Sequence, residues 1–236
     1  MSKLADYSTC EISDALIKLG TPHGGHVPDI NLISTLPSDT TVCGPAYTVQ
    51  MVLASDQSAP KLSAHFVDTA PASSVIVINT PPSKTNLRIS VPVRSPISPE
   101  LKNAVWGGLM TAGAQARSAV GVIISGRCRD IGEHASLNFP VFSRGHSTLG
   151  QSPFTRPSAI DVPVVIQAED DFPSVTVHPG DWMIGDKDGV VCVPRDLESK
   201  VVELAAKGRE VDAKCMTDIQ AGKGVQASFK AHRGKL

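Results

Sequence analysis

Polar and apolar positions near the start of the chain repeat with the period of an α-helix. Ser8 and Glu11 have the spacing of a capping box, in which each side chain accepts a backbone N–H of the other residue. Apolar residues follow at helical spacing from residue 12 to residue 19, and Gly20 ends the pattern. We therefore predict an amphipathic helix between Ser8 and Gly20.

Further along the chain, apolar runs alternate with segments of helical spacing. The expected strands are residues 44–53, 74–79, 120–124 and 162–167, followed by a hairpin of residues 182–186 and 189–194 that turns at Lys187 and Asp188. The expected helices are residues 61–67, a segment that begins at residue 100, and residues 197–219. This order of strands and helices predicts one α/β domain with some parallel strand pairing.

Two segments differ in composition from the rest of the chain. Residues 80–99 contain five prolines, so we expect an excursion over the surface with an edge strand near residues 88–93. Residues 223–236 carry Lys and Arg but no acid, and we expect a tail that is either solvated or laid against a partner; we favour a terminus without regular structure. The predicted domain therefore covers residues 1–222, and residues 223–236 form a basic C-terminal tail.

Composition excludes several classes of function. The chain has 236 residues, of which 41% are hydrophobic, enough for one substantial core. Lys and Arg number 22 against 23 for Asp and Glu, so the chain lacks the positive charge that nucleic acids or anionic membranes select. No apolar run approaches the roughly 20 residues of a membrane span, and the first residues lack the apolar stretch of a signal peptide. We expect a soluble cytoplasmic protein.

The cysteines indicate packing rather than chemistry. All five are far apart, and none belongs to a Cys-x-x-Cys pair, which argues against a disulfide framework or a zinc knuckle. Cys43 and Cys192 lie in apolar runs, where cysteine usually behaves as a small hydrophobic residue. We expect both to pack in the core.

The strand predicted at residues 120–124 leads into the segment with the most chemistry. Arg127, Arg129 and Asp130 follow it, at the end where α/β sheets bind ligands. Arg129 can bind a carboxylate through two hydrogen bonds, and Asp130 offers hard oxygen ligands for a magnesium ion. The alternative is that Arg129 and Asp130 form an ion pair that closes a loop.

A glycine pair lies upstream of this segment. Gly107 and Gly108 are near a predicted helix, where glycine lets backbone N–H groups approach an anion and the helix dipole favours negative charge. A carboxylate would fit there. Tight helix packing explains the two glycines equally well.

Several motifs occur in the same order as in one known family. They are Ser13-Asp14-Ala15-Leu16, Gly44-Pro45-Ala46-Tyr47-Thr48-Val49, Trp106-Gly107-Gly108-Leu109-Met110, Gly126-Arg127-Cys128-Arg129-Asp130, Pro179-Gly180-Asp181 and Asp188-Gly189-Val190-Val191-Cys192-Val193-Pro194. The chain resembles RraA-like proteins, the family of 4-hydroxy-4-methyl-2-oxoglutarate aldolases and regulators of ribonuclease activity. The resemblance extends from about residue 4 to residue 222. It implies a single-domain α/β/β swivelling sandwich, similar to a phosphohistidine domain, assembled as a homotrimer or hexamer with active sites between subunits.

The resemblance also implies an active site and a reaction. The catalytic residues would be Arg129 and Asp130, with Asp130 as the protein ligand of a Mg²⁺ or Mn²⁺ ion. The substrate would be held by Arg129 and by the backbone of Gly107, Gly108, Leu109 and Met110. The reaction would be the cleavage of a small 2-oxo acid through a pyruvate enolate, as in 4-hydroxy-4-methyl-2-oxoglutarate aldolase and oxaloacetate decarboxylase.

Two other functions stay open at this point. One is a non-catalytic regulator that binds a partner protein such as a ribonuclease, as other members of the family do. The other is a lyase redirected to a different substrate, in which Arg127 would bind a second acidic group. The physiological substrate, the identity of the metal and the choice between trimer and hexamer also stay open.

One position departs from the pattern of the family. The aldolases carry an acidic residue 21 positions before the arginine of the Arg-Asp pair, where this chain has Gly108. This difference favours the regulator, whereas Arg129 and Asp130 favour the lyase. A replacement carboxylate would come from Glu100, from Glu133 or, in a neighbouring subunit, from Asp212.

Overall fold

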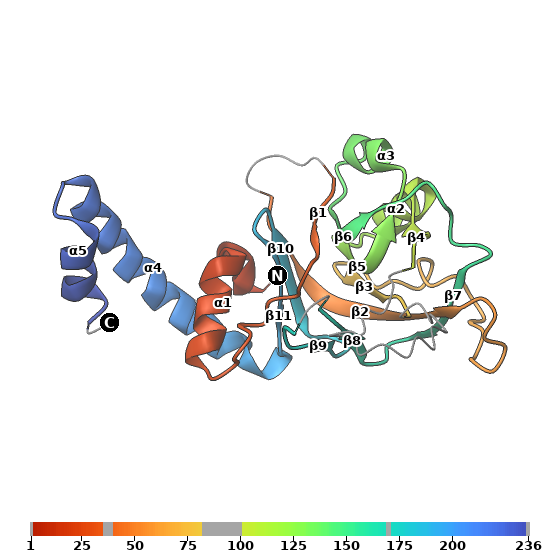
Figure 1. The fold of residues 1–236 in the computed structure, drawn as a ribbon, viewed down its shortest axis with the longest axis horizontal. Coiled ribbons are helices and arrows are strands. Elements are labelled where there is room, and N and C mark those ends of the chain that lie inside the picture. The colour runs from red at the N-terminus through yellow and green to blue at the C-terminus, as the bar shows by residue number, and fades with distance from the viewer. Residues whose placement is uncertain (1, 35–39, 82–100, 169–170, 235–236) are drawn as a thin grey trace, which may run out of the picture.

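The computed structural model describes residues 2–34, 40–81, 101–168 and 171–234, which form a mixed α/β fold (Figure 1). The strands are β1 (Asn31–Leu32), β2 (Val42–Leu53), β3 (Val75–Asn79), β4 (Ala104–Trp106), β5 (Gly121–Cys128), β6 (Val141–His146), β7 (Thr155–Ile160), β8 (Val164–Ile166), β9 (Val175–Val177), β10 (Trp182–Asp186) and β11 (Gly189–Val193). The α-helices are α1 (Thr9–Lys18), α2 (Gly108–Ala116), α3 (Ile131–Ser136), α4 (Glu198–Gln220) and α5 (Val225–His232). Short 3-10 helices are formed by Lys3–Asp6 and Arg195–Leu197.

Most strands belong to one sheet that curls into a nearly closed, barrel-like shape. Its order is β1-β6-β5-β3-β2-β10-β11, with β4 paired to β5 and β7 paired to β2. The pairs β2–β3, β3–β5, β4–β5 and β5–β6 are parallel, as the sequence predicted in part, and the remaining pairs are antiparallel. Strands β8 and β9 form a separate antiparallel pair. The parallel pairing brings the carboxyl ends of β4 and β5 to the same edge of the sheet.

Side chains of the central strands alternate between two cores. In β3, Ile76 and Ile78 pack in the core that contains Trp106, whereas Val75 and Val77 pack in a second core. Successive side chains of a strand point to opposite faces, so each core covers one face of the sheet. Because both faces are buried, the strand has a continuous apolar run instead of an alternating pattern. A third core lies between β10–β11 and helices α1 and α4.

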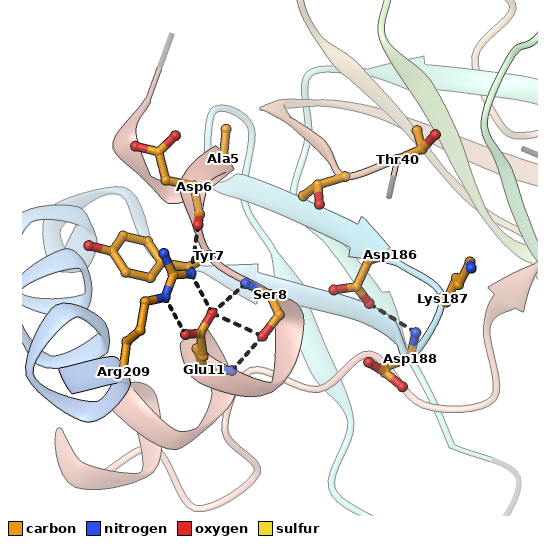
Figure 2. A pocket seen from close by; sticks show the side chains of 11 residues that line it. Ala5, Asp6, Tyr7, Ser8, Glu11, Thr40, Asp186, Lys187, Asp188 and Arg209 are labelled. Atoms are coloured by element: carbon orange, nitrogen blue, oxygen red, sulfur yellow. Dashed lines mark hydrogen bonds and ion pairs between the residues drawn. The ribbon is translucent and has the colours of Figure 1, made fainter. Parts of the chain in front are cut away.

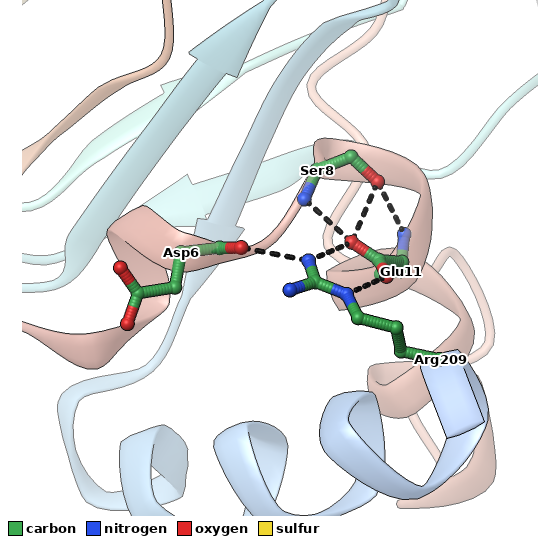
Figure 3. A network of polar contacts seen from close by, with 4 residues as sticks. All are labelled: Asp6, Ser8, Glu11 and Arg209. Atoms are coloured by element: carbon green, nitrogen blue, oxygen red, sulfur yellow. Dashed lines mark hydrogen bonds and ion pairs between the residues drawn. The ribbon is translucent and has the colours of Figure 1, made fainter. Parts of the chain in front are cut away.

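The N-terminal helix forms as predicted, and its cap is joined to a distant helix. Ser8 Oγ accepts a hydrogen bond from the N–H of Glu11 at 3.3 Å, and the Glu11 carboxylate accepts one from the N–H of Ser8 at 2.9 Å. Arg209 of α4 donates to both carboxylate oxygens of Glu11, at 2.6 and 2.7 Å, and to the carbonyl of Asp6 (Figure 2 and Figure 3). The hydrogen bonds from Arg209 are the main cause that lowers the pKa of Glu11.

Arg209→Gln is expected to lower the free energy of unfolding by up to about 1 kcal/mol at neutral pH, because the ion pair is half exposed. The pKa of Glu11 is lower in the folded state than in the unfolded state, so this stabilisation is present above the unfolded-state pKa. It is lost as the pH falls through the folded-state pKa. Urea denaturation between pH 7 and about pH 3 measures the effect. The control is Lys207→Gln, which removes an exposed ion pair with Glu203. A difference from wild type that does not shrink in acid would contradict this expectation.

Residues 61–67 are not helical, contrary to the prediction. Phe66 and Val67 are buried in the first core, but the carbonyl of Phe66 accepts hydrogen bonds from the Tyr47 hydroxyl at 3.2 Å and from Thr69 Oγ1 at 3.1 Å. This carbonyl thus accepts hydrogen bonds from side chains, whereas in a helix it would accept one from a backbone N–H. A segment of this length is also too short to nucleate a helix without tertiary support.

The helix expected from residue 100 begins only at Gly108. Residues 104–106 form β4 instead, and Trp106 pairs with Cys128 of β5. The apolar residues at 101, 105, 109 and 112 have helical spacing. Residues 104–106 nevertheless form a strand, because they pair with β5 and because Trp106 is buried in this arrangement. The edge strand predicted near residues 88–93, and most of the proline-rich segment, lie outside the described residues.

The C-terminal segment contains a helix, contrary to the expectation of a tail without regular structure. Helix α5 packs on α4, and both extend away from the sheet in Figure 1. The segment has no acid of its own, but Lys223 and His232 pair with Asp218, and Arg233 pairs with Asp212. Both acids belong to α4, which supplies the negative charge. Neither α4 nor any other described helix combines the length and the apolar character that a membrane span requires.

Candidate active site

The parallel pairing of β4 with β5 brings the two sequence motifs together. The N–H of Arg129 donates to the carbonyl of Trp106 at 2.9 Å, directly after the two strands end. Gly107 and Gly108 then begin α2, and Asp130 precedes α3. The glycine pair and the Arg-Asp pair therefore lie side by side at one edge of the sheet, where α2 and α3 meet it (Figure 1).

Asp130 has an unusual backbone and caps the neighbouring helix. Its φ of 61° and ψ of 43° lie in the left-handed region, which costs a residue other than glycine about 1 kcal/mol. One carboxylate oxygen, Oδ2, accepts the N–H of Gly108 at 3.0 Å and lies 3.5 Å from Nε of Arg129. The ion pair considered from the sequence is therefore present. The side chains of Arg129 and Asp130 are still 47% and 36% exposed, which leaves both accessible to a ligand.

Both glycines leave room for neighbouring carboxylates. A Cβ atom at Gly107 would lie 2.6 Å from Asp130 Oδ2, and one at Gly108 would lie 1.5 Å from Glu133 Oε2. Glu133 belongs to the first turn of α3, and its carboxylate covers the start of α2. The site thus combines one guanidinium, from Arg129, with two carboxylates.

A buried chain of hydrogen bonds joins α2 to α3. Trp106 Nε1 donates to Thr111 Oγ1 at 2.8 Å, and Thr111 Oγ1 lies 2.9 Å from His134 Nδ1. Burial lowers the pKa of His134, which favours a neutral ring. The Thr111 hydroxyl has one proton and two lone pairs, so it can accept from Trp106 and share a further hydrogen bond with His134 Nδ1, whose direction is set by the tautomer of the ring. These contacts fix α2 relative to α3, and with them the two motifs of the site.

Some of the backbone N–H groups at the start of α2 that were predicted to bind a substrate carboxylate already bind groups of the protein itself. The N–H of Gly108 donates to Asp130, and the N–H of Met110 turns back to the carbonyl of Gly107 at 3.0 Å. The side chain of Met110 packs against the first core, whereas Leu109 is 82% exposed at the rim of the site. Binding of a substrate carboxylate by this backbone stays a prediction.

Arg127 and Asp212, also considered from the sequence, do not join the site within one chain. Arg127 donates to the carbonyl of His146 at 3.1 Å, on the adjacent strand β6. Glu100 lies outside the described residues. Asp212 lies on α4 and pairs with Arg233, and Figure 1 shows this helix at the opposite end of the molecule from α2 and α3. A contribution of Asp212 to the site of a neighbouring subunit stays a prediction.

The cysteines pack as expected, and no ready-made metal cluster accompanies them. Cys192 is buried and Cys43 is partly buried; burial raises the pKa of Cys43 to about 11 and also raises that of Cys192. Within the described ranges, no three His, Cys, Asp or Glu side chains converge to hold a metal ion. A metal at this site would therefore bind the Asp130 carboxylate and complete its coordination with water or substrate.

A separate hollow of about 300 Å³ lies beside the start of α1 and the β10–β11 turn (Figure 2). Three of its charged groups contact one another or the backbone. Arg209 pairs with Glu11, and Asp186 accepts hydrogen bonds from the N–H of Thr9 at 2.8 Å, from Thr9 Oγ1 at 2.7 Å and from the N–H of Asp188 at 2.9 Å. These contacts hold α1 on the hairpin and confirm the turn predicted at Lys187 and Asp188.

Comparison with known proteins identifies the family. The family model described as "RraA-like: Aldolase/RraA" matches residues 9–192. The chain belongs to the RraA-like family. A relative from Halalkalibacterium halodurans, whose name proposes a 4-hydroxy-4-methyl-2-oxoglutarate aldolase, is 32% identical over 208 residues, which cover 87% of this RraA-like chain and 80% of that protein.

Two further proteins are similar to this RraA-like chain. Protein DlpA of Legionella pneumophila is 27% identical over 223 residues, which cover 94% of this chain and 32% of DlpA, so the chain spans about a third of that relative's length. The crystal structure of an uncharacterized protein from Pseudomonas syringae pv. tomato is 29% identical, with a TM-score of 0.73; the alignment covers 95% of this chain and 94% of that one. The predicted family is thereby confirmed.

Sequence reasoning missed two residues that build the site of this RraA-like protein. Thr111 and His134 are 23 residues apart, and no local pattern indicates that they meet. Glu133 was only one of three candidate acids. Its spacing of three residues from Asp130 is a usable signal, since the residue before a helix lies close to the third helical residue, and here the N–H of Glu133 donates to the carbonyl of Asp130.

Proposed function

We propose that this RraA-like protein is a divalent-metal-dependent carbon–carbon lyase that cleaves a 2-oxo acid. The aldol cleavage of 4-hydroxy-4-methyl-2-oxoglutarate and the decarboxylation of oxaloacetate are its expected reactions. The observation that carries the proposal is the position of Arg129 and Asp130 beside the start of α2, with both side chains accessible. The name of the relative from Halalkalibacterium halodurans supports the substrate class. The proposal includes the homotrimer or hexamer of α/β/β swivelling domains that the family resemblance implies.

The residues at the site fit a Mg²⁺ or Mn²⁺ ion. Asp130 offers carboxylate oxygens, which are the ligands these ions prefer. Asp130 would hold the ion, because its carboxylate lies beside Arg129 at the exposed edge of the sheet. When bound, the ion would polarise the keto group of the substrate and stabilise the negative charge that bond cleavage places on the keto oxygen.

Arg129 would bind and orient the substrate. Its planar guanidinium can donate two parallel hydrogen bonds to a carboxylate. A Cβ atom at Gly150 would lie 2.9 Å from Nη1 of Arg129, so the loop at Gly150 confines the guanidinium. A confined arginine fixes the orientation of a bound 2-oxo acid, and orientation of the breaking bond lowers the barrier to cleavage.

Release of pyruvate from the two substrates tests the proposal. We expect turnover with Mg²⁺, and we expect a chelator or Arg129→Ala to reduce the rate at least about 100-fold, because each removes stabilisation of the developing charge. Arg209→Gln on α4 is the matched control and should retain the wild-type rate. Release at the uncatalysed rate from both substrates would contradict the proposal.

The second candidate is a non-catalytic regulator of a partner protein, and Gly108 is the residue that favours it, because the family's acid is absent there. Mg²⁺ binding separates the two functions. A lyase should bind Mg²⁺ in a calorimetric titration, and the binding should weaken when Asp130 loses its charge. A wild-type protein that neither binds Mg²⁺ nor turns over either substrate would favour the regulator.

A further inference from the structure

The side chain of Glu133 on α3 occupies the space that a side chain at position 108 of α2 would fill. A Cβ atom at Gly108 would lie 1.5 Å from Oε2, 2.5 Å from Cδ and 2.9 Å from Cβ of Glu133. Real Cβ atoms do not approach other atoms so closely, so a side chain at position 108 and the observed Glu133 exclude each other. A carboxylate therefore stands at the start of α2, although it is supplied by α3.

The surroundings of Glu133 fix its backbone but leave its carboxylate available. The N–H of Glu133 donates to the carbonyl of Asp130 at 3.0 Å, which places Glu133 in the first turn of α3, next to the residue that precedes the helix. His134, the next residue, is anchored to Thr111 of α2. Within the described ranges, the Glu133 carboxylate makes no hydrogen bond or ion pair, whereas Asp130 contacts both Arg129 and Gly108. Glu133 is thus free to exchange a proton with a bound molecule.

We infer that Glu133 is a catalytic carboxylate that accepts and returns a proton during aldol cleavage. The inference rests on the proposed function. Glu133 takes the proton of the substrate's 4-hydroxyl group, and the O–H electron pair forms the new C=O bond at C4. The C3–C4 bond breaks, and its electron pair moves through C3 to the keto oxygen at C2. Protonated Glu133 then returns the proton to C3, so one 4-hydroxy-4-methyl-2-oxoglutarate gives two pyruvates without a further reactant.

Decarboxylation of oxaloacetate makes a different demand on the same site. The leaving carboxylate already carries its negative charge, so no proton has to be removed before the carbon–carbon bond breaks. Its electron pair moves to the keto oxygen, carbon dioxide leaves, and the new enolate carbon can take a proton from water. Aldol cleavage should therefore depend on Glu133, and decarboxylation should not. A structural role for Glu133 would affect both reactions alike.

The two reactions of Glu133→Gln test the inference. Gln has the same size and cannot accept the proton, so we expect kcat for aldol cleavage to fall at least about 100-fold. The rate of oxaloacetate decarboxylation and the affinity for Mg²⁺ should stay within about threefold of wild type, less than the loss that a perturbed metal site causes. An equal loss in both reactions, a loss of Mg²⁺ binding, or unchanged aldol cleavage would each overturn the inference. A wild-type protein without either activity would overturn the proposed function, and this inference with it.

A relocated carboxylate provides a second test. In the Glu133→Ala background, Gly108→Asp places its carboxyl group one bond beyond a Cβ atom that lies 1.5 Å from the position of the lost Oε2. Aspartate in the first turn of a helix is also favourable. We expect this double variant to cleave 4-hydroxy-4-methyl-2-oxoglutarate at least about 10-fold faster than its matched control, Gly108→Asn with Glu133→Ala. This is less than the roughly 100-fold low end of a general-base contribution, because the relocated carboxyl group is displaced from the position of the lost one. Equal rates for the two double variants would overturn the proton-transfer role.

Discussion

Asp130→Asn is expected to reduce pyruvate release at least about 100-fold and to leave the fold intact. Asparagine has the shape of aspartate and tolerates the left-handed backbone of this position better than most residues. Its side-chain oxygen can still accept the N–H of Gly108 and so keep the cap of α2. It lacks the negative charge that holds a divalent cation, so Mg²⁺ affinity should fall together with turnover.

Comparison of Asp130→Ala with Asp130→Asn separates the effect of the negative charge from the effect of the helix cap. Alanine removes both, and the lost cap should lower the free energy of unfolding by about 1 kcal/mol relative to Asp130→Asn. Calorimetric titration with Mg²⁺ and thermal denaturation of the two variants measure these effects. If Asp130→Asn keeps its Mg²⁺ affinity and turns over substrate within about threefold of wild type, Asp130 serves only as the cap of α2.

Gly25→Ala is expected to lower the free energy of unfolding by at least about 3 kcal/mol. Gly25 has a φ of +68°, and a Cβ atom there would lie 2.4 Å from the carbonyl oxygen of Cys192 and 2.6 Å from Cδ1 of Leu16. The obstacle on the Cys192 side is backbone and cannot rotate away. The carbonyl of Gly25 also accepts the N–H of Cys192 at 2.8 Å, which ties the two segments together.

Gly20→Ala is the matched control for this prediction. Gly20 has a φ of +88°, but no atom would lie within 4 Å of its Cβ, so only the backbone strain of about 1 kcal/mol is expected. Urea denaturation of both variants gives the difference. Equal losses at the two positions would show that the close approach of Gly25 to β11 contributes nothing to stability.

Gly108 has a physical explanation that its place in the sequence does not reveal. From the sequence, a glycine at the position of an acid favours a protein without catalytic activity. In the structure, the carboxylate of Glu133 covers this glycine, and a Cβ at 108 would collide with it. The site therefore contains two carboxylates, one from Asp130 and one from Glu133. In the lyase proposed for this RraA-like protein, these two carboxylates would be the acidic groups of the reaction.

Local signals determined the elements whose stabilising partners are close in the sequence. The capping box at Ser8 and Glu11 starts α1, and the turn between Asp186 and Gly189 joins β10 to β11, because both depend on contacts within a few residues. The apolar runs of β3 and β5 were equally clear, since both faces of these strands are buried. The motifs that identified the family likewise needed no knowledge of the fold.

Only the tertiary structure decided the elements that depend on distant partners. Residues 104–106 form a strand because β5 pairs with them, and the basic segment after residue 222 becomes helical against α4, whose acids neutralise it. Glu133 joins the site because α3 packs beside α2, and Gly108 is small enough to admit its carboxylate. In each case the stabilising contact lies between segments that the one-dimensional pattern cannot bring together, and only packing in three dimensions determines it.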